Sequence, residues 1–154
     1  MARTSKSHPR PGKHDSAAMT GVWARDLSAD LDVIESWGAR LVLTLVEQHE
    51  LEKLQVPHLG SAVQSRGLEW IHLPIADGSV PPSSFEKAWE THGKEIRALL
   101  RDGKDIVVHC KGGLGRAGMI AAHSWLSSGY LLTEQSNRCG GHAKARLKTP
   151  TRKC

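Results

Sequence analysis

A short apolar strand runs directly into a glycine-rich loop and then into a helix, and this unit constrains the fold more than any other feature. The strand covers residues 105–109, the loop covers residues 110–116 with three glycines, and the helix continues to about residue 126. Glycine adopts positive φ values without strain, so loop amides can turn toward one point, at which the helix N-terminus aims its dipole. The unit therefore predicts a binding site for a tetrahedral oxyanion.

Strands and helices alternate along the chain before this unit. The continuous apolar run at residues 41–46 is typical of a buried parallel strand, and Pro74 ends another strand at residues 70–73. This alternation predicts an α/β fold with a mostly parallel central sheet flanked by helices. The other expected elements are a first strand near Val22 and Trp23, and helices from Ser28 to Gly38, over residues 47–54, over residues 59–66, and from a capping box at Ser83 and Glu86 to Gly103.

The 154 residues suffice for one domain, and the absence of an apolar run near 18 residues argues against a membrane span. Residues 1–14 carry four basic residues and no acid, and residues 131–154 carry six against Glu134 alone. The remaining body has eleven Lys or Arg against fifteen Asp or Glu, so we expect no specific nucleic-acid binding. The expected organisation is a flexible arm at residues 1–13, a domain at residues 14–132 and a disordered basic tail at residues 133–154.

The spacing of the cysteines and the composition of the N-terminal residues indicate the cellular compartment of the protein. Cys110, Cys139 and Cys154 form no CxxC pair and no even-numbered framework, which fits a reducing environment. The N-terminal residues lack the apolar stretch of a secretory signal. We therefore expect a cytoplasmic protein, acting as a monomer and without contact to a membrane.

A cysteine and an arginine stand at the two ends of the glycine-rich loop. The GxxxxGK[ST] spacing of a nucleotide P-loop is absent. The loop amides, the helix N-terminus and Arg116 each favour the thiolate of Cys110, which makes this residue the candidate nucleophile. Arg116 can hold two phosphoryl oxygens and stabilise the charge of an in-line displacement. The candidate phosphate-binding residues are Lys111, Gly112, Gly113, Leu114, Gly115 and Arg116.

Asp77 is the candidate general acid for the leaving oxygen. It lies in a loop bounded by glycine and proline after the strand at residues 70–73. Loops at the carboxyl ends of parallel strands gather over one crevice, so Asp77 and Cys110 are expected to face the same pocket. An aspartate before Gly78 is also a common turn residue. Glu47 follows another strand end, and it either faces the crevice or begins a solvated helix.

The sequence from His109 to Arg116 resembles the HCxxGxxR signature of the cysteine-dependent protein phosphatases of the dual-specificity and tyrosine class. Together with the Leu-Pro-Ile-Ala-Asp-Gly segment at residues 73–78, it is similar to the kinase-associated phosphatase group and its bacterial relatives, over residues 11–130. The resemblance implies the compact fold of these enzymes and a phosphocysteine intermediate on Cys110. It further implies Asp77 as acid and then base, phosphoprotein monoesters of Tyr, Ser or Thr as substrates, and neither a metal nor another cofactor.

One residue departs from the family pattern and leaves alternatives open. The family has Ser or Thr directly after the loop arginine, where its hydroxyl assists hydrolysis of the intermediate, and this chain has Ala117. A phosphate-binding pseudophosphatase with little turnover is therefore one alternative. A sulfurtransferase or arsenate reductase, which also uses a cysteine-headed anion loop, is another. We expect His109 to position the loop by hydrogen bonding, and His72 and His123 to be structural.

Overall fold

Three parallel strands form the part of the fold that positions the candidate site residues. In the computed structural model they are β4 (Ala39–Thr44), β5 (Glu69–His72) and β6 (Asp105–Cys110). β4 lies between the other two and pairs in parallel with both. The predicted α/β class with a parallel central sheet is confirmed. The structure describes residues 4–9, 11–12, 14–15, 23–24, 26–112, 115–126, 131–135 and 144–148.

The register of these strands aligns their carboxyl ends. Thr44 at the end of β4 pairs with His72 on β5 and with His109 on β6. Residues that follow the three strands therefore leave the sheet at the same edge. Segments far apart in the sequence meet there, as expected for loops at the carboxyl ends of parallel strands.

The sheet continues beyond β6 with strands from both ends of the chain. Its order is β5-β4-β6-β1-β8-β7, with β1 (Thr4–Pro9) parallel to β6, and with β8 (Lys144–Lys148) antiparallel to both β1 and β7 (Leu131–Gln135). β1 lies within the arm expected at residues 1–13, and β7 and β8 overlap the tail expected at residues 133–154. Backbone hydrogen bonding, which is independent of an apolar side-chain pattern, is what joins them to the sheet. A separate ribbon pairs β2 (His14–Asp15) with β3 (Trp23–Ala24).

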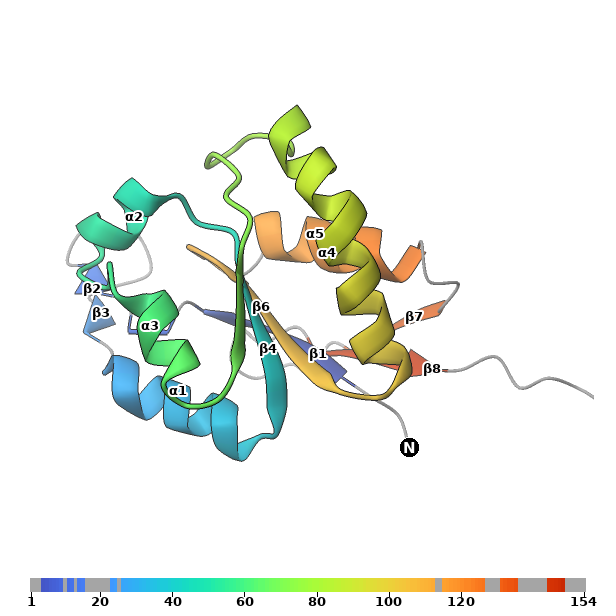
Figure 1. The fold of residues 1–154 in the computed structure, drawn as a ribbon, viewed down its shortest axis with the longest axis horizontal. Coiled ribbons are helices and arrows are strands. Elements are labelled where there is room, and N and C mark those ends of the chain that lie inside the picture. The colour runs from blue at the N-terminus through green and yellow to red at the C-terminus, as the bar shows by residue number, and fades with distance from the viewer. Residues whose placement is uncertain are drawn as a thin grey trace, which may run out of the picture.

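Helices cover both faces of the sheet. Figure 1 shows α1 and α3 on one face and α4 and α5 on the other, as right-handed crossovers in opposite directions across the sheet require. Within the described part of the chain, no helix combines the length and apolar character needed to cross a membrane. The bounds are α1 (Leu27–Ser36), α2 (Gln48–Lys53), α3 (Leu59–Gln64), α4 (Ser83–Arg101) and α5 (Arg116–Leu126).

Two helix starts differ from the sequence prediction. Asp26, and not Ser28, caps α1, because its carboxylate accepts the amide hydrogen of Ala29 at 2.8 Å. The N-cap of α4 is Pro82, which has no side-chain cap bond, so the predicted capping box at Ser83 does not form. Short polar side chains in succession offer several possible starts, and tertiary packing selects among them.

The core lies on both sides of β4. Leu41, Val42 and Leu43 are fully buried, which explains the continuous apolar run in this strand. Gly60 on α3 allows that helix to approach Trp70 on β5, since a Cβ at this position would come within 2.4 Å of the indole ring. The close packing of α3 against β5 fixes the position of the Trp70 ring beside the carboxyl edge of the sheet.

Candidate active site

Cys110 and Arg116 lie where the loop unit predicts them. Cys110 is the last residue of β6 and is 3% exposed, and Arg116 is the first residue of α5 and is 5% exposed. The two side chains interact electrostatically. Of the predicted phosphate-binding residues, Gly113 and Leu114 lie outside the described residues.

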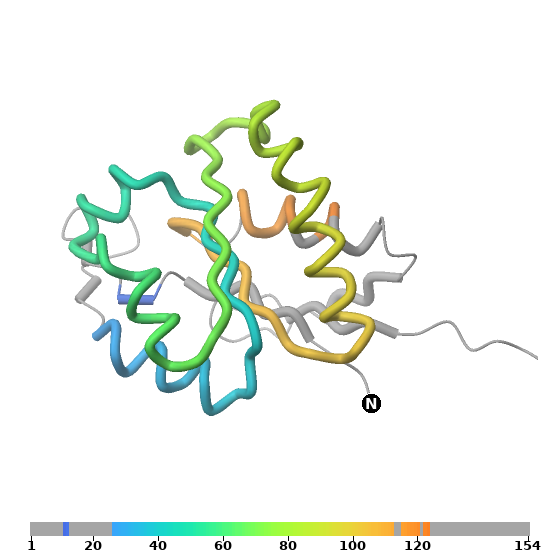
Figure 2. Tube along the Cα trace, in the orientation of Figure 1, coloured from blue at the N-terminus to red at the C-terminus, as the bar shows by residue number. Residues whose placement is uncertain are grey.

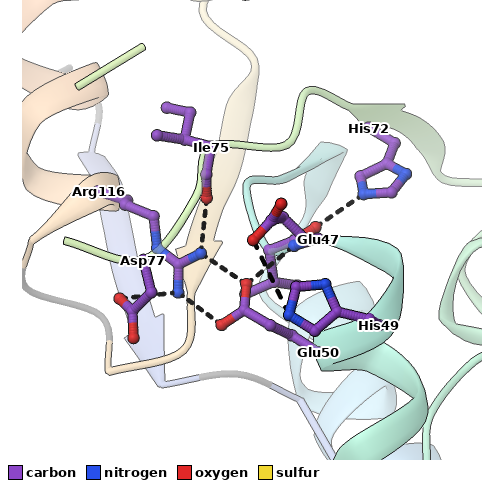
Figure 3. A network of polar contacts seen from close by, with 8 residues as sticks. Glu47, His49, Glu50, His72, Ile75, Asp77 and Arg116 are labelled. Carbon is purple, nitrogen blue, oxygen red and sulfur yellow. Dashed lines mark hydrogen bonds and ion pairs between the residues drawn. The ribbon is translucent and has the colours of Figure 1, made fainter. Parts of the chain in front are cut away.

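Arg116 is held by a buried glutamate from a different part of the chain. Its NH1 and NH2 donate to the two carboxylate oxygens of Glu50 at 2.7 and 3.0 Å, and the side chains are 4% and 9% exposed. NH1 also donates to the backbone carbonyl of Ile75 at 2.8 Å. Figure 3 shows the guanidinium plane facing Glu50 from α2, with the Ile75 carbonyl beside it. This bidentate pairing fixes the orientation of the guanidinium.

Asp77 reaches the same guanidinium from the solvent side. Its Oδ1 lies 3.3 Å from NH2 of Arg116, and its side chain is 65% exposed. Figure 2 shows how the segment after β5 runs past the end of the sheet before it enters α4. The structure thus brings together the predicted acid and the predicted phosphate clamp.

Glu50 is the site residue that the sequence reading missed. It is the third residue of α2 and forms a capping box with Glu47, whose amide donates to Glu50 Oε2 at 2.9 Å. Glu47 itself, the acid considered from the sequence, contributes to this helix start, and its side chain is 35% exposed. The available signal was a second acid in the helix that follows β4, but its partner Arg116 lies 66 residues away in the sequence.

Charge pairing keeps Glu50 and Arg116 ionised in a buried position. Burial acts to raise the pKa of Glu50, but the hydrogen bonds from Arg116 and the Glu47 amide outweigh it, so that the pKa is lowered. Burial acts to lower the pKa of Arg116, but the hydrogen bonds and charge of Glu50, with Asp77 and Cys110, raise it. Arg116 therefore presents a permanent positive charge beside Cys110.

Replacing Glu50 with alanine should destabilise the protein strongly, because it leaves the buried guanidinium without its carboxylate. We expect a loss of about 3–5 kcal/mol in the free energy of unfolding, measured with urea. Since the pKa of Glu50 is lowered in the folded protein, its contribution is present above the ordinary pKa of glutamate and is lost as the pH falls through the lowered value. Glu52→Ala, an exposed change on the same helix, is the control and should have little effect. Equal stability of the two variants would contradict the assigned role.

The family model described as "Polymorphic toxin system, DSP-PTPase phosphatase" matches residues 18–129, a span that includes Asp77, Cys110 and Arg116. The chain belongs to this family. The resemblance found in the sequence to dual-specificity and tyrosine phosphatases is thereby confirmed.

Individual relatives agree with the family assignment. The chain is 33% identical over 98 residues to cyclin-dependent kinase inhibitor 3 of Rattus norvegicus, covering 64% of this chain and 45% of that protein. It is 32% identical over 99 residues to the Homo sapiens protein of the same name, with 64% and 45% covered. A probable protein tyrosine phosphatase type IVA A of Dictyostelium discoideum is 30% identical, with 53% of this chain and 54% of that protein covered. The chain thus spans about half the length of these relatives.

Two solved structures share the fold. Kinase associated phosphatase, crystallised with its catalytic-site cysteine replaced by serine, aligns with a TM-score of 0.69 at 23% identity, covering 83% of this chain and 74% of that one. Tk-PTP, described as being in its active form, aligns with a TM-score of 0.54 at 30% identity, covering 66% and 63%. The α/β arrangement of this family member therefore matches phosphatase structures.

Proposed function

We propose that this family member is a cysteine-dependent phosphatase that hydrolyses phosphoprotein monoesters of Tyr, Ser or Thr through a phosphocysteine intermediate. The observation that carries the proposal is the buried guanidinium of Arg116, which Glu50 holds and Asp77 approaches to 3.3 Å, and which interacts electrostatically with Cys110. The family match over residues 18–129 supports a catalytic domain at residues 14–132. We place the enzyme in the cytoplasm as a monomer that needs no metal.

In the first step the Cys110 thiolate attacks phosphorus in line with the ester oxygen. The S–P bond forms as the P–O bond to the alcohol or phenol breaks, and protonated Asp77 gives its proton to the leaving oxygen. Arg116 stabilises the charge on the equatorial oxygens. NH1 of Arg116 donates its two hydrogens to Glu50 and to the Ile75 carbonyl. NH2 donates to Glu50 as well, and its second hydrogen is the one that we assign to phosphate.

Phosphate binding and acid catalysis are coupled in this arrangement. Asp77 Oδ1 lies 3.3 Å from NH2, the group that we assign to a phosphoryl oxygen. A bound phosphate displaces the Asp77 carboxyl toward the leaving oxygen. In the second step the Asp77 carboxylate takes a proton from water, which attacks phosphorus, breaks the S–P bond and releases inorganic phosphate with the thiolate.

Asp77→Asn should slow the enzyme in a way that depends on the leaving group. An alcohol is expelled poorly without a proton donor, so we expect a loss of about 100-fold or more on an alkyl phosphate, and a much smaller loss on para-nitrophenyl phosphate. The comparison of kcat/KM on the two substrates measures this. Asp102→Asn is the control, since Asp102 lies before the start of β6, roughly 16 Å of strand from Cys110. An equal loss on both substrates would contradict the acid role of Asp77.

Ala117 favours a second candidate function, a phosphate-binding pseudophosphatase with little turnover. The residue is fully buried directly after Arg116, and its methyl group supplies no hydroxyl to the departing thiolate. The first step would then proceed while hydrolysis of the intermediate lags behind it. The protein would then accumulate as phosphocysteine after one turnover and release little inorganic phosphate.

Ala117→Ser distinguishes the two candidate functions. We expect the serine variant to hydrolyse the intermediate several-fold faster, because a hydroxyl near Cys110 stabilises the leaving thiolate. Rapid-mixing kinetics with para-nitrophenyl phosphate separates the burst of nitrophenol from steady turnover. If the wild type shows a burst and the variant shows a faster steady turnover, hydrolysis of the phosphocysteine limits the rate of the wild type. Unchanged steady turnover would show that Ala117 does not limit the rate.

A further inference from the structure

The segment that carries Asp77 is almost free of charge. Between His72 and Glu86, Asp77 is the only charged residue. Residues 76–80 are all exposed, and apart from Asp77 they are alanine, glycine, serine and valine. The side of the candidate site that supplies the acid therefore presents neutral and apolar groups to solvent.

Val80 is the large apolar residue of this exposed stretch. It is 76% exposed, and in the described part of the chain Val33, at 58%, is the only other large hydrophobic residue that is exposed. Single exposed valines are common on protein surfaces. Val33 is such a residue, because Figure 1 shows its helix α1 at the lower edge of the molecule and the segment that enters α4 at the upper edge. Val80 differs from it by lying close to the acid.

A hydrogen-bonded turn holds Val80 near Asp77. The Ser79 amide donates to the Ala76 carbonyl at 3.1 Å, so that Asp77 and Gly78 are the two central residues of the turn. Gly78 has a φ of 72°, which glycine adopts without strain at the second central position. Val80 follows the turn directly, and the turn therefore presents the acid and the exposed valine together.

The reach from Val80 to the reacting groups suits a peptide substrate. The Cα atoms of Asp77 and Val80 are at most about 11 Å apart, the span of three extended residues. Asp77 Oδ1 lies 3.3 Å from NH2 of Arg116, the group that we assign to a phosphoryl oxygen. An extended peptide advances about 3.3 Å per residue, so residues up to three positions from the phosphorylated one come within reach of Val80.

The other side of the site is charged. Glu47 and His49 come from the start of α2, and both side chains are at least partly exposed. Figure 3 shows these two residues beyond Glu50, away from Asp77. A peptide that crosses the site therefore meets ionisable groups on the side of α2 and an apolar side chain on the side of Val80.

We propose that Val80 is a specificity-determining residue that packs against an apolar side chain within three positions of the phosphorylated residue of the substrate. This inference rests on the proposed function and deepens it, because it names the substrate class as a phosphorylated segment with an apolar neighbour. The contact removes apolar surface of both partners from water, which favours binding. A small aryl phosphate carries no such neighbour and cannot make the contact.

The test is the binding of phosphopeptides to the Cys110→Ser protein, measured by fluorescence anisotropy. Two peptide series have phosphotyrosine or phosphothreonine at the centre of an alanine background, with one leucine placed at each position from three before to three after it. We expect leucine at one or two positions to raise the affinity about five-fold over the all-alanine peptide. Val80→Asp should abolish this gain, so that the leucine and alanine peptides bind equally.

Two further variants control for the effect of Val80→Asp. Val80→Ile keeps an apolar side chain and should retain the leucine gain. Val33→Asp makes the same change at the other exposed valine and should also retain it. Equal binding of all peptides would overturn the proposal, as would a leucine gain that survives Val80→Asp or is lost to the same degree in Val33→Asp. If Val80→Asp does not fold, Val80→Ser decides by the same criterion.

The binding measurement separates this inference from the proposed function. Binding to the Cys110→Ser protein needs no turnover. If the wild type hydrolyses no phosphate ester while the leucine gain depends on Val80, the phosphatase proposal fails and the assignment of Val80 stands. If the wild type hydrolyses para-nitrophenyl phosphate while neither peptide series shows a leucine gain, the phosphatase proposal stands and the assignment of Val80 is wrong.

Discussion

Replacing Cys110 with serine should reduce hydrolysis of para-nitrophenyl phosphate by roughly ten-thousand-fold or more. A thiol forms an anion near neutral pH in a site like this one, whereas a serine hydroxyl does not, so the variant has no nucleophile. Serine is smaller than cysteine and fits the buried end of β6, where Cys110 is 3% exposed. We therefore expect a folded, inactive protein with an unchanged melting temperature.

The other cysteines provide matched controls for this variant. Cys139→Ser and Cys154→Ser remove a thiol from positions to which the proposed chemistry assigns no role. Both variants should keep the wild-type rate. If Cys110→Ser retained activity within ten-fold of the wild type, the covalent mechanism would be wrong.

The second large effect is expected from Arg116→Ala. Loss of the guanidinium removes the group that stabilises charge on the transferring phosphoryl, so kcat/KM should fall by about 1,000-fold. The same change leaves the Glu50 carboxylate buried without its partner, and we expect the free energy of unfolding to fall by about 3–5 kcal/mol. Urea unfolding should precede the kinetic assays, so that activity is measured under conditions in which the variant is folded.

Two further variants separate these effects of Arg116. Arg116→Lys keeps a positive charge but cannot form the two parallel bonds to Glu50, so it should recover stability better than activity. Arg40→Ala is the control, because Arg40 pairs with Glu69 on the exposed surface and should change neither quantity greatly. An Arg116→Ala enzyme within ten-fold of wild-type kcat/KM would contradict the role of the clamp.

The sequence predicts those parts of the fold that depend on local patterns. The apolar run in β4 and the glycines that end the helices each mark an element, and β4 and these helices are present in the structure. Cys110 and Arg116 are predictable because a short loop fixes their separation. Asp77 is predictable because loops after parallel strands converge at one edge of the sheet.

Contacts between distant segments are what the sequence does not indicate. Glu50 reads as an ordinary residue in the first turn of a helix, and only the fold brings it to Arg116, 66 residues later. The alignment of Thr44 with His72 and His109 depends on the register of three strands, which no local pattern specifies. Strands β1, β7 and β8 join the sheet through backbone pairing. Their sequences lack the apolar periodicity from which strands are predicted.

Trapping the phosphocysteine on Cys110 would show the covalent intermediate itself. The wild-type protein should be mixed with para-nitrophenyl phosphate, quenched within the burst phase and digested for mass spectrometry under conditions that preserve an S–P bond. We predict one phosphoryl group on the peptide that contains Cys110, and none in Cys110→Ser. Continued turnover with no phosphoryl group on that peptide would contradict a phosphocysteine mechanism.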